Sequence, residues 1–159
     1  MDRLLSLIEK NPRLTNAELA VMLGESEETV KEQIKTLEDS GIIKGYRAII
    51  DKDKTAMQNV TALIEIKVHP KFDHGFEEIA ERISQFDEVE SVYLMSGGYD
   101  LCALVNNKTF QEVAMFVARR LSTLEDVLST ATHFILKRYT EQDIILFESP
   151  KDDRGNISL

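Results

Sequence analysis

From residue 60 onward the spacing of apolar residues changes twice from the period of a strand to that of a helix and back. This repeat restricts the possible folds of the chain more than any other feature. Apolar residues alternate with polar ones over residues 60–68, as in a strand with one buried face. Pro70 ends this strand, and we expect Asp73 to cap a helix. The inner stripe of that helix is expected to contain Phe76, Ile79, Ala80 and Ile83. Residues 89–95 return to a strand pattern, which completes a β-α-β unit.

The second unit follows a Gly-Gly pair and has the same order. Residues 101–105 predict a strand, and Thr109 with Glu112 predicts a capping box at the start of a helix. The helix is expected to bury Phe110, Val113, Val117 and Leu121. Residues 127–136 predict the fourth strand. Two β-α-β units in tandem give an α+β, ferredoxin-like βαββαβ sheet with both helices on one face. A second copy of the chain is expected to cover the other face, so we predict a homodimer.

The N-terminal region shows helical rather than strand patterns. Apolar residues at positions 4–8 form one stripe of a first helix, which ends near Pro12. Thr15 and Glu18 have the spacing of a capping box and predict the start of a second helix. Gly24 follows at the position where a left-handed residue ends many helices.

A third helix is expected almost immediately, with Ser26 as its N-cap and Gly41 at its end. Its buried stripe is Val30, Ile34 and Leu37. Three short helices with a tight turn between the last two are typical of a helix-turn-helix, although a plain three-helix bundle has the same stripes. The centre of the outward face of the third helix would be mostly acidic: Glu28, Glu32, Lys35 and Asp39.

The charge of the chain argues against a nucleic-acid partner. The formal net charge is −9, whereas proteins that bind nucleic acid usually carry a basic excess. The first 50 residues contain 7 Lys and Arg against 9 Asp and Glu, or −2, and the remainder contains 12 against 19, or −7. The predicted helix-turn-helix is therefore less acidic than the rest of the chain, but it is not basic.

The chain divides into four predicted segments. Residues 1–45 would form a three-helix (winged) helix-turn-helix, and residues 46–59 a strand and linker, because the β-prone run of residues 42–51 leads into polar sequence. Residues 60–148 would form the ferredoxin-like domain, and residues 149–159 a flexible tail.

Several classes of function lack support in the sequence. The only cysteine, Cys102, excludes an intrachain disulfide, and with no signal or membrane-spanning pattern we expect a cytoplasmic protein. The histidines, His69, His74 and His133, are too scattered for a metal site, and His133 is interpreted as a packed or interface residue. No phosphate-binding glycine loop or nucleophile elbow is present, so we predict neither an enzyme nor a bound cofactor.

Three strings of the sequence, residues 37–46, 96–100 and 127–137, resemble in their order the Lrp/AsnC (feast/famine) transcription regulators of bacteria and archaea. Residues 37–46 are similar to the family's exit from its recognition helix, and residues 96–100 to its G-x-x-D loop. Residues 127–137 resemble the last strand of its sensor domain. The resemblance covers almost the whole chain and implies an ACT-like (RAM) sensor domain. It also implies a homodimer, often assembled into tetramers or octamers, that binds double-stranded DNA in the major groove.

By this resemblance, residues 26–37 form the recognition helix. Family members commonly carry arginine where this chain has Glu32, Gln33 and Thr36, so some phosphate and guanine contacts would be missing. Avidity between linked dimers is one way to compensate. Another is that flanking basic residues, Arg13, Lys44 and Arg47, contact phosphates. The residues expected to read base edges are then Thr29, Lys31, Gln33 and Lys35.

Gly97 and Gly98 allow two interpretations. They could form a two-residue hairpin turn at positive φ. They could also let the backbone approach a ligand, so that amides hold its carboxylate while Asp100 pairs with its α-ammonium group. With the resemblance, we predict a small-molecule effector site, expected to take an amino acid. Its residues would be Ser96, Gly97, Gly98, Tyr99, Asp100 and Thr132.

The sequence thus predicts a sequence-specific DNA-binding transcription regulator whose assembly or DNA affinity responds to a small effector. Two alternatives stay open. Some relatives of the same architecture decarboxylate a sirohaem-type tetrapyrrole. A sensor that no longer binds DNA and acts on a partner protein would fit the acidic third helix.

Overall fold

The computed structural model describes residues 2–56, 59–69 and 75–146. The chain divides into two compact units, residues 1–49 and residues 50–159, whereas the sequence placed the boundary after residue 45. No helix in the described part of the chain is long and apolar enough to cross a membrane. The predicted tail, residues 149–159, lies outside the described residues.

The first unit contains three helices: α1 (Asp2–Lys10), α2 (Asn16–Leu23) and α3 (Glu27–Asp39). They enclose a small apolar core formed by Leu4, Ile8, Leu19, Ala20, Val30 and Leu37. These residues belong to the predicted stripes, while Leu23 and Ile34 are half-buried at the edge of the core. Burying one face of each short helix supplies the stability that helices of this length lack on their own.

The start of α2 and the turn between α2 and α3 have the predicted caps. The Thr15 hydroxyl accepts from the Glu18 amide, and the Glu18 carboxylate accepts from the Thr15 amide. Gly24 ends α2 at φ 73°, and the Ser26 hydroxyl accepts from the Thr29 amide at the start of α3. Only one residue, Glu25, separates Gly24 from Ser26, which fixes α3 closely behind α2.

Residues 42–50, predicted to begin a strand, form no strand in the structure. A β-strand needs a neighbour to accept and donate its ladder hydrogen bonds. In the single chain the amides of Ile42 and Ile43 instead bond the Leu37 carbonyl, which ends α3, and the following residues run on in irregular conformation. The prediction of a strand here was therefore wrong for the single chain.

The second unit begins with a short 3₁₀ turn, Lys52–Lys54, and contains the predicted sheet. Its elements are β1 (Val60–Val68), α4 (Glu77–Ser84), β2 (Val89–Leu94), β3 (Leu101–Asn107), α5 (Phe110–Phe116), a π-helical turn (Val117–Leu121) and β4 (Val127–Ile135). The strands lie in the order β2-β3-β1-β4, and every neighbouring pair is antiparallel. This is the ferredoxin-like arrangement expected from the sequence.

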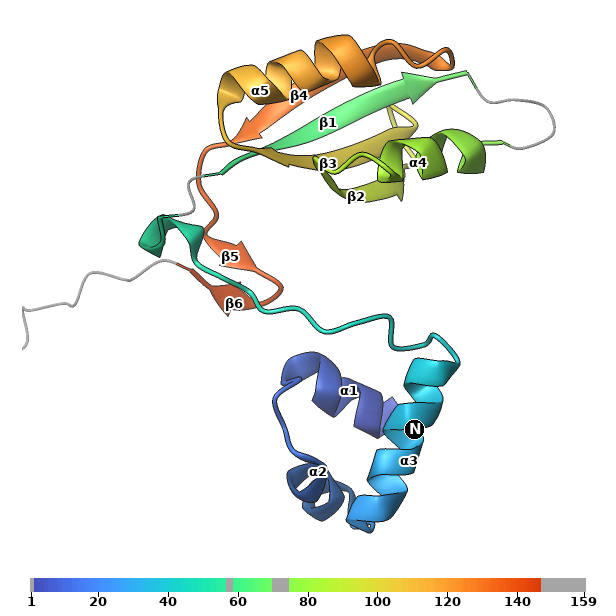
Figure 1. Cartoon of the computed structure of the whole chain (residues 1–159), viewed down its shortest axis with the longest axis vertical. Helices are drawn as coiled ribbons and strands as arrows, with labels where there is room; N and C mark the ends of the chain where they lie inside the picture. The colour runs from blue at the N-terminus through green and yellow to red at the C-terminus, as the bar shows by residue number, and fades with distance from the viewer. Residues whose placement is uncertain (1, 57–58, 70–74, 147–159) are drawn as a thin grey trace, which may run out of the picture. The chain divides into compact units, whose positions relative to one another are not determined.

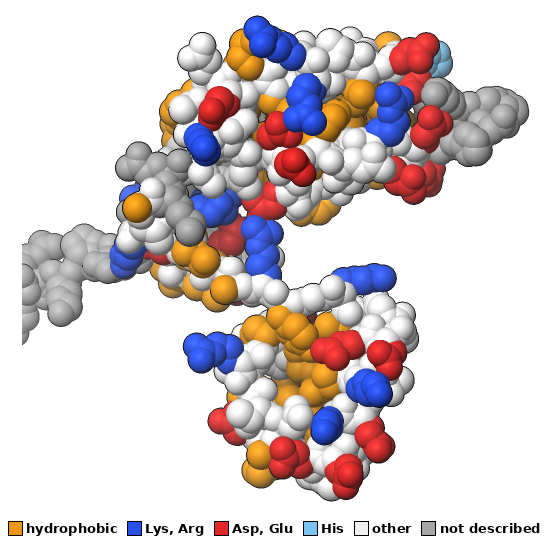
Figure 2. Space-filling model, in the orientation of Figure 1, with side chains coloured by type: hydrophobic (Ala, Val, Ile, Leu, Met, Phe, Trp, Pro, Cys, Tyr) orange, Lys and Arg blue, Asp and Glu red, His pale blue; other side chains and the backbone are white. Residues whose placement is uncertain are grey.

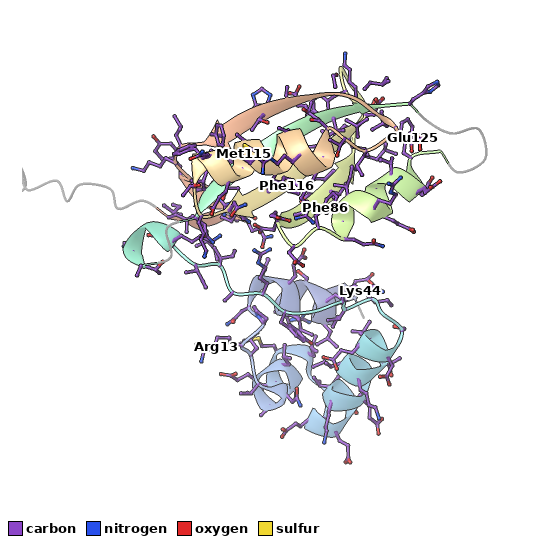
Figure 3. All side chains as sticks on the ribbon, turned by 45° about the horizontal axis from the view of Figure 1, so that its top comes forward. Arg13, Lys44, Phe86, Met115, Phe116 and Glu125 are labelled. Atoms are coloured by element: carbon purple, nitrogen blue, oxygen red, sulfur yellow. The ribbon has the colours of Figure 1, made fainter. Side chains whose placement is uncertain are left out.

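Both helices pack on the same face of the sheet (Figure 1), where they enclose the larger core. Inward residues of β1, such as Ile64 and Ile66, belong to the same buried cluster as Ile83 of α4 and Val113 of α5. At one end of the core, the rings of Phe86 and Phe116 meet edge to face, with centroids 5.4 Å apart (Figure 3). No helix in the described part of this unit covers the other face of the sheet.

Three local features differ from the expectations. α4 begins at Glu77, after Phe76, which makes no side-chain cap bond, and the expected cap Asp73 lies outside the described residues. Phe110, expected inside, is 54% exposed, and its ring meets the Phe134 ring edge to face. An unpredicted hairpin, β5 (Thr140–Glu141) and β6 (Ile144–Ile145), follows β4.

Candidate nucleic-acid interface and effector loop

Helix α3 presents its charged residues to solvent along most of its length. Val30 and Leu37 are fully buried, whereas Lys31 and Lys35 are exposed, as are the neighbouring carboxylates. Within the described residues, neither lysine makes an ion pair. Their ammonium groups are therefore available to an anionic partner.

The predicted base-reading residues lie on two sides of α3. At about 100° per residue, Lys31 and Lys35 share one side, whereas Thr29 and Gln33 share the other. An acidic row, Glu28, Glu32 and Asp39, runs between them along the outward face. In the space-filling view, acidic and basic side chains are mixed on the visible face of the first unit (Figure 2). The fold thus brings the four residues onto one helix but does not gather them in one patch.

Two of these residues already have partners near the start of α3. The Gln33 side-chain amide donates to the Glu25 carboxylate at 2.8 Å, and the Thr29 hydroxyl lies 2.8 Å from the Ser26 hydroxyl. Gln33 is half-buried as a result. To read a base edge, Gln33 would have to leave Glu25, so Lys31 and Lys35 are the more accessible pair.

Basic residues after α3 are held close to its C-terminal end. Lys44 folds back over Gly41, where a Cβ atom would lie only 2.8 Å from its Nζ. The Tyr46 hydroxyl donates to the Glu38 carboxylate at 2.9 Å. Burial raises the pKa of Tyr46, and this hydrogen bond raises it further. This anchor places Arg47, which is exposed, directly after a residue attached to α3. Arg13 projects outward between α1 and α2 (Figure 3).

The predicted effector loop connects β2 to β3 and comprises residues 95–100. Ser96, Gly97 and Gly98 are exposed, and neither glycine has a positive φ. The two-residue hairpin interpretation was therefore wrong, because six residues separate the strands. A Cβ atom at Gly97 or Gly98 would meet nothing within 4 Å, so the loop backbone is open to solvent on that side.

Asp100 fixes the base of this loop through its backbone and its side chain. Its amide donates to the Ile66 carbonyl at 3.1 Å, and its carbonyl accepts from the Met95 amide at 2.8 Å. One carboxylate oxygen, Oδ2, accepts from the Val68 amide at 2.9 Å, where the register of β1 shifts. The side chain is thereby oriented and half-buried, and its other oxygen, Oδ1, accepts no hydrogen bond from the described residues.

Tyr99 lies near two titratable residues of the sheet, Cys102 and Glu65. Burial raises the pKa of Tyr99, and electrostatic interactions with these two groups raise it further. Burial also raises the pKa of Cys102, with a smaller effect from Glu65. Cys102 is therefore a buried thiol kept protonated rather than a reactive thiolate.

Thr132 does not join the loop in the single chain. It is half-buried in β4 and pairs with Ile64, which in turn pairs with Ala103 of β3. Two strand spacings, about 9–10 Å, separate Thr132 from β3. The structure brings together the five predicted loop residues at 96–100 and leaves Thr132 apart from them.

The sheet face turned away from α4 and α5, called here the open face, mixes apolar and polar side chains. The pairing registers place on it Thr61, Leu63, Glu65, Lys67, Ser91, Tyr93, Cys102, Leu104, Asn106, Ser129, Ala131, His133 and Ile135. Two polar side chains of this face lie close together, with 3.3 Å between His133 Nε2 and a Glu65 carboxylate oxygen. No group of three or more potential metal ligands occurs in residues 2–56, 59–69 and 75–146.

Comparison with family models assigns both units. Residues 3–44 match the winged helix-turn-helix DNA-binding model, and residues 61–145 match the Lrp/AsnC ligand binding domain. The two matches follow the division seen in the structure.

Individual relatives agree with these matches. YugG, an uncharacterised HTH-type transcriptional regulator of Bacillus subtilis, is 45% identical over 152 residues, covering 95% of this chain and 91% of that protein. The regulatory protein AsnC of Haemophilus influenzae is 28% identical over 142 residues, covering 89% and 93%.

Solved structures extend the likeness to the fold. A transcriptional regulator of Neisseria meningitidis, solved as a complex with L-Met, superposes with a TM-score of 0.70 at 25% identity and covers 87% of this chain and 88% of its own. Escherichia coli AsnC gives 0.67 at 23% identity, covering 87% and 91%, and shows the shared fold alone. The chain belongs to the Lrp/AsnC family and is a DNA-binding transcription regulator with a ligand-binding domain.

Proposed function

We propose that the chain acts as a homodimer, with α3 in the major groove of its operator, and that an amino acid bound at residues 96–100 changes its affinity for DNA. The observation that carries the DNA part is the exposed side of α3, where Lys31 and Lys35 form no ion pair with any described residue. A helix fits the major groove, and its side chains can reach base edges there.

The proposed contacts fall into two groups. Lys31 and Lys35 lie along α3 and reach bases or nearby phosphates, with Thr29 and Gln33 on the other side of the helix. Lys44 and Arg47 follow α3 and contact the phosphate backbone, which fixes the position of the helix but carries no sequence information.

The acidic row on α3 has a physical role in this arrangement. Glu28 and Glu32 repel phosphates, so they weaken binding to arbitrary DNA. Facing base edges, a carboxylate can accept a hydrogen bond from the N4 amino group of cytosine. Specificity would then depend on placing Glu28 and Glu32 over bases, while the lysines and Arg47 lie near phosphates.

The amino-acid effector rests on the geometry of Asp100 and its loop. The Val68 amide orients the Asp100 carboxylate, and an α-ammonium group can pair with its remaining oxygen. Exposed backbone at Gly97 and Gly98 can approach the carboxylate of the same ligand. The Neisseria meningitidis regulator of similar fold was solved with L-Met, which supports an amino acid as the effector class.

The homodimer rests on the open face. Leu63 and Leu104 lie at its centre on the two inner strands, and Tyr93 on β2 is 50% exposed. A second copy related by a two-fold axis would cover this face with the same face of its own. Thr132 belongs to the proposed effector site only if assembly brings it near a loop of another copy.

A gel shift with the promoter region of its own gene tests the proposal. We expect a shift at low salt that weakens as salt rises and that changes with one amino acid in a panel of twenty. No shift at low salt, with or without amino acids, would contradict DNA regulation. That result would favour the second candidate, a sensor acting on a partner protein, for which the acidic row on α3 is the supporting observation.

A further inference from the structure

A small hollow at one end of the sheet collects basic side chains in a domain that is acidic as a whole. Its volume is about 100 Å³, and it is lined by Ile50, Asp51, Lys52, Asn59, Thr61, Ile135, Leu136, Lys137, Arg138 and Leu146. Residues 51–159 carry a net charge of −7, with 12 basic residues in all, and three of those twelve line this hollow. Such a concentration of positive charge requires an explanation.

Arg138 is the most firmly positioned of the three cations. Its Nη2 donates to the Thr61 hydroxyl at 3.2 Å, and Thr61 is only 6% exposed. The Thr61 hydroxyl in turn donates to Asn106 Oδ1 at 2.5 Å, and the Asn106 amide donates to the Glu90 carboxylate. This chain of hydrogen bonds holds the guanidinium plane, whereas a free arginine would lose side-chain entropy on binding a ligand.

Arg138 keeps donors for a further partner. Its Nη1 lies 3.7 Å from the Glu141 carboxylate, which is an ion pair but longer than a hydrogen bond. A guanidinium has five N–H donors, and the described residues use one of them in a hydrogen bond, the one to Thr61. The remaining donors match the paired oxygens of a carboxylate or phosphate.

The carboxylates around the hollow already have basic neighbours. Asp51 lies 3.9 Å from Lys54, and Glu141 faces Arg138, so each carboxylate has a basic neighbour. Lys52 makes no side-chain hydrogen bond or ion pair among the described residues, and Lys137 lies 5.2 Å from the centre of the Tyr139 ring. The local balance is positive.

We propose that this hollow binds the oxyanion group of a small molecule, a phosphate or a carboxylate, held by Arg138, Lys52 and Lys137. The volume admits a single group of this kind, since it corresponds to about three water molecules. Thr61 lies near one end of β1, and the Asp100 loop lies beside Val68 at the other end. Seven residues of strand, about 23 Å, separate the two sites, so this site is independent of the effector loop.

Isothermal titration of the full chain with inorganic phosphate, and separately with acetate, at constant ionic strength tests the proposal. We expect saturable binding with one site per chain, and the tighter of the two anions identifies the class of oxyanion. Arg138→Gln should weaken binding at least tenfold. Lys108→Gln removes the same charge from an exposed position outside the hollow and should leave binding unchanged.

A second variant covers the possibility that Arg138→Gln disturbs the fold through Thr61. Lys52→Gln breaks no side-chain hydrogen bond or ion pair in the described structure and should still weaken binding several-fold. Absence of saturable binding of either anion would overturn the proposal, as would equal affinities for Lys52→Gln, Arg138→Gln and Lys108→Gln.

Discussion

The Asp100 carboxylate accepts a hydrogen bond from the Val68 backbone amide at 2.9 Å, and so joins the loop before β3 to the end of β1. This bond gives Asp100 two roles that substitutions can separate. It holds the loop against the sheet, and it orients a negative charge beside exposed glycine backbone.

Asp100→Asn should preserve the loop and abolish the effector response. The asparagine side-chain oxygen can still accept from Val68, but the side chain no longer carries the charge that pairs with an α-ammonium group. We expect a loss of at least tenfold in effector affinity with little change in thermal stability. Asp100→Ala should also lose about 1 kcal/mol of stability, because the Val68 amide loses its acceptor. Effector titration and thermal unfolding of both variants measure the two effects separately.

Gly41→Ala should destabilise the helix-turn-helix by about 1–2 kcal/mol, because Gly41 has a φ of 70°. The new Cβ would also displace Lys44, whose Nζ would lie 2.8 Å away. Gly97→Ala is the matched control, since its Cβ meets nothing within 4 Å and its φ is not left-handed. Urea denaturation followed by circular dichroism compares the two. Equal stabilities for the two variants would show that the backbone at Gly41 is not constrained as described.

The capping box of α2 predicts a loss of stability in acid. Hydrogen bonds from Thr15, through its backbone and then its hydroxyl, lower the pKa of Glu18 from its usual 4.5. The pKa of Glu18 is lower in the folded state than in the unfolded state. The stability that the ionised Glu18 adds is therefore complete above the unfolded pKa and is lost as the pH falls through the folded pKa. Glu18→Gln should flatten the decline of the melting temperature between pH 5 and 3, whereas Glu9→Gln on α1 should not. A decline of the same steepness in Glu18→Gln would exclude this carboxylate as the cause.

Leu63→Lys tests whether the open face is the dimer contact. Burying an unpaired ammonium group between two sheets costs several kcal/mol, so the dimer should dissociate at concentrations at least one hundredfold higher than normal. Val21→Lys is the control, because Val21 is 84% exposed on α2. Sedimentation velocity reports the association state. A Leu63→Lys protein as dimeric as the control would place the contact elsewhere.

Features determined by neighbouring residues were predictable from the sequence. The capping boxes at Thr15 and Thr109 form as expected, because each side chain bonds an amide three residues away. The alternation in β1 likewise identified its buried face, since residues such as Ile64 and Ile66 repeat at the period of a strand.

Features that depend on distant partners or on unusual backbone were not predictable. The run after Gly41 has the composition of a strand but finds no neighbouring strand in the single chain. The β5–β6 hairpin was missed because its turn residues, Gln142 and Asp143, adopt φ of 45° and 65° without the glycine that usually marks such a turn. The pairing of Gln33 with Glu25 also needed coordinates, because a turn brings the two side chains together.

The salt dependence of operator binding tests the central claim most directly. Fluorescence anisotropy with a labelled duplex from the promoter of its own gene, between 50 and 300 mM salt, gives the slope of log K against log salt. If Lys31, Lys35, Lys44 and Arg47 of both chains contact phosphates, log K should fall linearly with log salt, with a slope no steeper than about −7. The Lys31→Gln, Lys35→Gln double variant should bind more weakly and with a shallower slope. Affinity and slope unchanged in that variant, or no binding at the lowest salt, would contradict the placement of α3 on DNA.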